Sequence, residues 1–181
     1  MIYSISLHTA GLIAGLALLL LSLAALLSPA RNFLPQFPRS RVAGAVLLTI
    51  DFIWSIWLLV TMEMGEFSGF RRPLLVALPI GFFLVLRFVD EFLAVRALGI
   101  LCLLAAEPLL NAAFLRPETS RLLVTVLAYL MIVAGLLWVT MPYLLRDQIQ
   151  WSTKSDGRWR LLSGAGFVLG AAITVCAFVA Y

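Results

Sequence analysis

The sequence has few charged residues and almost no histidine or lysine. Asp, Glu, Lys and Arg make up 12% of its 181 residues, whereas ordinary soluble domains hold about 25%. His8 is the only histidine, which excludes a haem held by two histidine ligands. The two cysteines, Cys102 and Cys176, lie in separate apolar runs, where a thiol is most simply a small hydrophobic group.

Sequence motifs that carry catalysis are also missing. There is no G-x-S-x-G, H-E-x-x-H, C-x-x-C, P-loop or Rossmann glycine pattern, and no lysine inside an apolar run that could hold a retinal. The sequence therefore indicates no particular cofactor and favours a protein that is not an enzyme. Catalysis on a lipid by Asp and Glu side chains alone stays open as an alternative.

Apolar residues dominate instead, at 63% of the chain, with a mean hydropathy of +1.06. Runs of about 20 apolar residues, long enough to cross a bilayer as helix, recur along the sequence. Lipid offers the backbone no hydrogen-bond partner, so only helices or a closed barrel can span it. The runs are continuous rather than alternating, which excludes a barrel with a polar lumen. The sequence predicts an all-α, polytopic integral membrane protein without a soluble domain.

Six transmembrane helices in one bundle are predicted, separated by short polar connections. Most connections contain Gly or Pro, which interrupt helices. The spans cover about residues 5–27, 42–62, 73–89, 92–115, 122–145 and 161–181.

The third connection, RFVDEFLAVR, contains neither Gly nor Pro but holds four charges: Arg87, Asp90, Glu91 and Arg96. A single helix over 73–115 would be about 65 Å long, roughly twice the hydrocarbon thickness. The charges therefore mark an interfacial turn, in which we expect Asp90 to cap the following span. The alternative is a buried cluster in which Arg87 or Arg96 pairs with an intramembrane carboxylate.

The basic residues are distributed unevenly between the two sides of the bundle. Four lie in the second and fourth connections, and nine lie in the other three. The richer side is expected to be cytoplasmic, which places both termini on the non-cytoplasmic side. We expect a bacterial cytoplasmic (inner) membrane, and no nucleic-acid partner, since the cations lie singly between apolar runs. The nine are Arg31, Arg39, Arg41, Arg87, Arg96, Arg146, Lys154, Arg158 and Arg160.

Asp51 lies near the middle of the second predicted span. A charge at the bilayer centre costs at least about 2.5–3.5 kcal/mol, so an intramembrane carboxylate is a candidate functional group. Helical spacing puts Ser55 on the same stripe, one turn further along. Asp51 is either a protonatable or cation-binding acid facing the bundle interior, or a carboxyl that bonds a neighbouring helix and fixes packing.

Glu107 is the second intramembrane acid. Pro108 follows it and frees a backbone carbonyl one turn earlier, and Asn111 lies one turn later. An acid, an amide and a freed carbonyl could ligate a cation or relay a proton, as at broken helices. The alternative is an ordinary proline kink.

Two further sets of residues could bind a metal ion or pack helices together. His8, Met62 and Met64 could hold copper(I), although the sequence favours interfacial packing for them and no metal site. Small residues at GxxxG spacing allow close helix contact, either between the first and sixth spans or with another subunit. These are Gly11, Gly15, Gly166 and Gly170.

The expected function is that of an accessory or structural subunit, or of a self-associating membrane protein. Its expected partners are the lipid bilayer and either further copies of the chain or a larger membrane complex. The alternative is a small proton- or cation-coupled transporter or channel that uses Asp51 and Glu107.

Overall fold

In the part that the computed structural model describes, which is residues 3, 5–27, 30–89 and 92–179, the chain consists of helices joined by short connections, with no strand. This confirms the all-α prediction. Six helices in this part are long and apolar enough to cross a membrane, as predicted. They are α1 (Leu7–Leu27), α3 (Arg41–Thr61), α4 (Arg71–Phe88), α5 (Leu93–Ala113), α6 (Arg121–Thr140) and α8 (Asp156–Val179).

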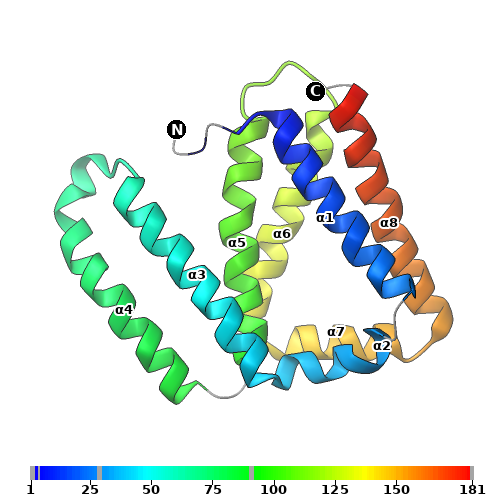
Figure 1. Cartoon of the computed structure of the whole chain (residues 1–181), viewed down its shortest axis with the longest axis horizontal. Coiled ribbons are helices and arrows are strands. Elements are labelled where there is room, and N and C mark those ends of the chain that lie inside the picture. Colours follow the sequence, from blue (N-terminus) through cyan, green and yellow to red (C-terminus); the bar gives the residue numbers. More distant parts are fainter. Residues whose placement is uncertain (1–2, 4, 28–29, 90–91, 180–181) are drawn as a thin grey trace.

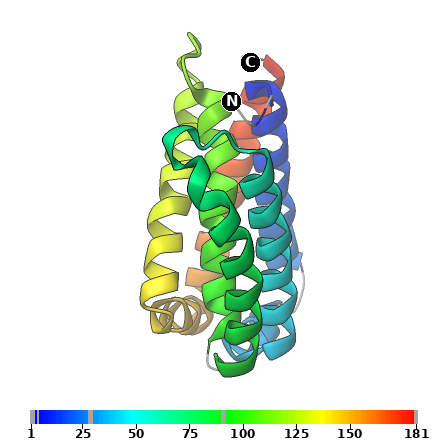
Figure 2. The ribbon, with the colours of Figure 1, turned by 90° about the vertical axis from the view of Figure 1, so that its left-hand side faces the viewer.

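The six spans pack as three pairs, as Figure 1 shows: α1 with α8, α5 with α6, and α3 with α4. The α5–α6 pair is central, with α1–α8 on one side and the α3–α4 hairpin on the other. The start of α1 and the end of α8 lie together, and we call this the terminal end. Figure 2 looks onto the α3–α4 hairpin, with α4 in front.

Helix backbones approach one another closely where glycines meet. A Cβ on Gly15 of α1 would lie 3.1 Å from the carbonyl oxygen of Gly170 on α8. A Cβ on Gly99 of α5 would lie 2.9 Å from the carbonyl oxygen of Gly135 on α6. Because lipid supplies no hydrophobic force between helices, such close packing is a principal source of attraction.

The buried core forms around α5. At the terminal end, one cluster joins α5 to α1, α6 and α8 through residues such as Leu109, Val124 and Ile173. A smaller cluster joins α5 to α3 through Leu48, Leu93 and Ala97. The α3–α4 hairpin is therefore attached to the bundle through α3.

Two short segments and one longer helix lie across the bundle at the end opposite the termini (Figure 1). They are α2 (Ala30–Phe33), the 3₁₀ helix η1 (Leu34–Arg39) and α7 (Tyr143–Thr153), which we together call the platform. Leu145 and Ile149 of α7 are buried against Val95 of α5. A second 3₁₀ helix, η2 (Gly65–Phe70), joins α3 to α4 at the terminal end.

The fifth predicted span, 122–145, is too long, because α6 ends at Thr140 and α7 is a separate helix. Met141 leaves the helical conformation, with φ −127° and ψ 73°. The physical cause is Pro142, since a residue before proline disfavours the α conformation. The chain then continues as an amphipathic helix that lies across the bundle, a geometry typical of membrane interfaces.

The break predicted within RFVDEFLAVR is confirmed, since α4 ends at Phe88 and α5 begins at Leu93. Phe92 occupies the N-cap position of α5 in a left-handed conformation, with φ 56°, and its side chain makes no cap hydrogen bond. The cap predicted for Asp90 falls, like Glu91, outside the described residues.

Gly170→Ala tests the close contact between α1 and α8, with Gly164→Ala on the same helix as the matched control. A Cβ at Gly170 would lie 2.8 Å from the backbone nitrogen of Leu19, whereas one at Gly164 meets nothing within 4 Å. We expect Gly170→Ala to lower the free energy of unfolding by about 1–3 kcal/mol. Gly164→Ala should leave it unchanged or raise it. Thermal unfolding in mild detergent measures both, and equal effects would contradict the packing role.

Candidate functional site

Asp51 is the central residue of α3, which runs from Arg41 to Thr61. Its side chain is buried, with 2% of the residue exposed. Neither carboxylate oxygen has a hydrogen-bond partner within the described part of the chain. A buried polar group without a partner is costly, and a charged one much more so. Asp51 is therefore a candidate functional group rather than a packing residue with a bonded neighbour.

A cavity of about 380 Å³ lies beside Asp51, between α3, α4 and α5. Apart from Asp51, the only polar side chain among the described residues that line it is that of Ser55, which the sequence placed on the same stripe. The rest of the lining is aliphatic or aromatic. It comprises Leu48, Phe52, Leu74, Ala77, Leu78, Gly81, Phe82, Val85 and Ile100.

Cys102 of α5 lies near Asp51. Its thiol is close enough to interact electrostatically with the carboxyl. No sequence pattern placed these two residues together, because a lone cysteine in an apolar run has no predicted neighbour. Asp51 therefore sits where three helices meet, within reach of α5 as well as of α4.

Glu107 and Asn111 belong to a different region, nearer the terminal end. Asn111 lines a second cavity of about 380 Å³, with Tyr3, Ser6 and Arg116 among its other lining residues. Glu107 is half-buried and acts electrostatically on Tyr3. It lines neither this cavity nor the one around Asp51. The structure thus divides the four predicted site residues between two regions, with Asp51 and Ser55 in one and Glu107 and Asn111 in the other.

Tyr3 is a residue of this second region that the sequence did not single out. Its hydroxyl accepts a hydrogen bond of 2.7 Å from the indole nitrogen of Trp54, and its ring centroid lies 5.5 Å from that of Trp57. Burial raises the pKa of Tyr3, and the nearby charge of Glu107 raises it further, against the Trp54 hydrogen bond, which lowers it. An aromatic residue beside a span was the one available signal, since tyrosine is common at membrane interfaces.

The arginines of the RFVDEFLAVR segment do not reach the Asp51 carboxyl. Arg87 and Arg96 are both exposed, and the guanidinium of Arg87 lies 5.9 Å from the ring centroid of Phe88. The alternative of a buried arginine–carboxylate pair with Asp51 is therefore wrong for these two described residues.

The candidate copper ligands have different surroundings. The ring of His8 makes an edge-to-face contact with Phe178, with centroids 6.1 Å apart. Met62 is exposed and Met64 half-buried beyond the end of α3. Among the His, Cys, Asp and Glu residues that the structure describes, no group of three or more could hold a metal ion.

A third cavity, of about 270 Å³, lies at the platform end. Three buried serines from three helices line it: Ser22 of α1, Ser152 of α7 and Ser163 of α8. The indole nitrogen of Trp159 donates to the carbonyl of Ala25 over 3.0 Å at its edge. The sequence did not predict this cavity, because isolated serines in apolar runs carry no distinctive pattern.

The chemistry available at Asp51 is that of one carboxyl and one hydroxyl in apolar surroundings. Such a group can exchange a proton, or bind a cation or a hydrogen-bonding group that enters the cavity. Comparison of the chain with protein-family models, with curated proteins and with solved structures finds no match.

Proposed function

We propose that this protein is an accessory or structural membrane subunit, which associates with further copies of itself or with a larger membrane complex through α4. The supporting observation is an unexpected combination in α4. Among the six spans the one containing α4 has the lowest mean hydropathy, yet it contains no buried residue. A helix that faced only lipid would be expected to be among the most apolar.

The outward side of α4 has the form of a packing surface. Val76, Ile80 and Phe83 are exposed and follow one another at helical spacing, so they form one stripe. A stripe of bulky side chains on a weakly attached helix suits insertion between the side chains of a neighbouring helix. The partner proposed for this stripe is another membrane helix.

A photoreactive benzoylphenylalanine at Phe83 tests this proposal in the membranes of cells that make the protein. Phe83 is 67% exposed on α4, and Val133, 55% exposed on α6, provides the matched control position. We expect irradiation to give a discrete product of higher mass from position 83 and only the single chain from position 133. A single chain from both positions would contradict the proposal.

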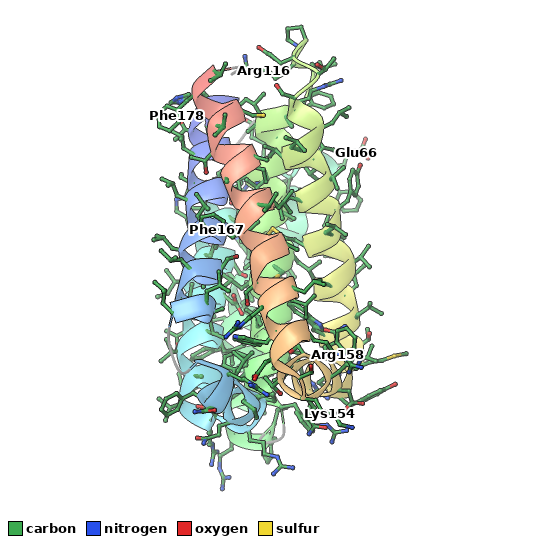
Figure 3. All side chains as sticks on the ribbon, turned by 90° about the vertical axis from the view of Figure 1, so that its right-hand side faces the viewer. Glu66, Arg116, Lys154, Arg158, Phe167 and Phe178 are labelled. Carbon is green, nitrogen blue, oxygen red and sulfur yellow. The ribbon has the colours of Figure 1, made fainter. Side chains whose placement is uncertain are left out.

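We further propose that the platform end is cytoplasmic, so that both termini lie on the non-cytoplasmic side of a bacterial cytoplasmic membrane. Lys154 and Arg158 lie at the platform end and Arg116 at the other (Figure 3). The guanidinium of Arg158 stacks over the Trp151 ring, 4.8 Å from its centroid. Cationic and aromatic side chains gathered beside an in-plane helix support a cytoplasmic interface.

Single cysteines in a chain with Cys102 and Cys176 replaced by alanine test the orientation. Cysteines at Arg39 and Ser155 should be shielded from a membrane-impermeant thiol reagent in intact cells. Cysteines at Ser68 and Thr119 should be labelled. All four positions are exposed in the structure, so burial within the protein does not explain a difference. The reverse pattern would invert the proposed topology.

A second candidate function is a small proton- or cation-coupled transporter or channel that uses Asp51 and Glu107. It is supported by the unpaired, buried carboxyl of Asp51 at the centre of a span. The ionised form of such a group is costly at this depth, so the group can act as a proton carrier when its surroundings change.

Proton uptake into proteoliposomes tests the second candidate. A trapped pH-sensitive dye reports proton entry, driven by a potassium gradient with valinomycin. We expect Asp51→Asn and Glu107→Gln each to abolish uptake, because each removes the only protonatable group of that side chain. Unchanged uptake in both variants, or no uptake by the unaltered protein above that of empty vesicles, would exclude this function.

A further inference from the structure

We propose that the cavity around Asp51 binds a lipophilic organic cation, a molecule with a hydrocarbon body and one positive charge. The inference goes beyond the accessory function. It deepens the second candidate function, a transporter or channel, because it names a class of ligand. It rests on that candidate only in taking Asp51 as the charged group of the site. Binding does not require that the molecule be carried across the membrane.

The charge of the ligand follows from the carboxyl. Asp51 is buried and lines the cavity, and its oxygens have no partner in the described chain. An unpaired carboxylate at the centre of a span is unfavourable, and a cation in the cavity would offset that cost. An anion would be repelled, and a neutral hydrocarbon would leave the carboxyl without a partner.

The chain does not supply this cation itself. Its thirteen Lys and Arg residues lie in the connections or within five residues of the end of a span. The one histidine, His8, packs against Phe178 at the terminal end. A second copy of the chain would therefore also lack a cation at the depth of Asp51, so a cation that pairs with the carboxylate would come from another molecule.

The lining suits a small inorganic cation poorly. Metal ions such as Na⁺, Mg²⁺ and Ca²⁺ need several oxygen ligands to replace their water shell. Beside the carboxyl, the described residues that line the cavity offer one side-chain hydroxyl, from Ser55, and otherwise carbon. A cation whose charge is already surrounded by hydrocarbon does not need such ligands, and it gains from the apolar walls.

The shape and walls of the cavity suit such a molecule. Its volume of about 380 Å³ falls in the range of about 300–1,000 Å³ typical of small-ligand sites. Phe52 and Phe82 line it, stacked with ring centroids 4.5 Å apart, and aromatic rings attract cations. Gly81 leaves room on the α4 side, because a Cβ there would meet nothing within 4 Å. Since α4 has no buried residue, the ligand can enter sideways from the lipid in which it dissolves.

Equilibrium dialysis of the purified full-length protein in mild detergent tests the proposal. The probe is radiolabelled tetraphenylphosphonium, and tetraphenylborate serves as an ion of the same shape and opposite charge. We expect saturable binding of the cation and no competition from the anion. Asp51→Asn should weaken cation binding about tenfold or more, whereas Glu66→Gln, which removes an exposed charge on η2, should leave it unchanged.

Gly81→Leu provides a second, independent variant. It keeps the carboxyl and fills the cavity from α4, where no neighbouring atom obstructs the first carbon of the side chain. We expect it to weaken binding about tenfold or more without lowering the temperature of thermal unfolding. If Asp51→Asn fails to fold, this variant alone tests whether the cation binds in the cavity beside Asp51.

Three outcomes would overturn the inference: equal binding of the two ions, binding that both variants leave intact, or no saturable binding. The first two indicate partition into detergent and protein surface only. Proton uptake that depends on Asp51, together with no cation binding, would leave the second candidate standing and remove this inference. Cation binding without any proton uptake would support this inference and remove proton transport as the second candidate.

Discussion

Close contact between helix backbones at glycine residues is the interaction on which the rest of the structure depends. In lipid, apolar side chains gain little by leaving their solvent, so helices are held by close packing and the few polar contacts they can make. Gly44 shows the consequence for the site. A Cβ on this residue of α3 would lie 2.7 Å from the backbone nitrogen of Ala94 on α5. This contact lies near the platform end, and α3 and α5 move apart toward the terminal end (Figure 1).

The position of that crossing explains why a cavity exists beside Asp51. Beyond this crossing, the space between α3, α4 and α5 is left open as the cavity that Asp51 lines. Toward the terminal end, the hydrogen bond between Tyr3 and Trp54 ties α3 to the segment before α1. α3 is thus fixed at Gly44 and at Trp54, and Asp51 lies between these two contacts, beside the cavity.

The sequence predicts the six spans well because lipid imposes a simple rule. A span must be long, apolar and helical, and these properties can be read from one segment at a time. GxxxG spacing likewise pointed to Gly15 and Gly170, which the structure brings together. Gly44, Gly99 and Gly135 make contacts of the same kind without such spacing, so no local pattern distinguished them from other glycines.

Properties that depend on which helices are neighbours could not be predicted in the same way. Asp51 and Glu107 lie on α3 and α5, which do pack together, yet the two acids belong to different regions of that interface. Which residues of α3 and α5 face one another depends on how the two helices pack, and no local pattern in one sequence shows this. The platform helix α7 was missed for a related reason. Its apolar stripe, with Leu145 and Ile149, is short and interrupted by polar residues, and it becomes recognisable only against Val95.

The two unusual features of this protein, a weakly packed α4 and an unpaired Asp51, have one physical origin. A helix that packed tightly onto α3 and α5 would fill the cavity beside Asp51 and leave no room for a ligand. Phe52 and Phe82 instead hold α4 to α3 by one aromatic contact, and Gly81 keeps the space between them open. The same looseness exposes Val76, Ile80 and Phe83 on the other side of α4. A partner bound to that outer stripe would press on the wall of the cavity, so association and the occupancy of the Asp51 site would be coupled through a single helix.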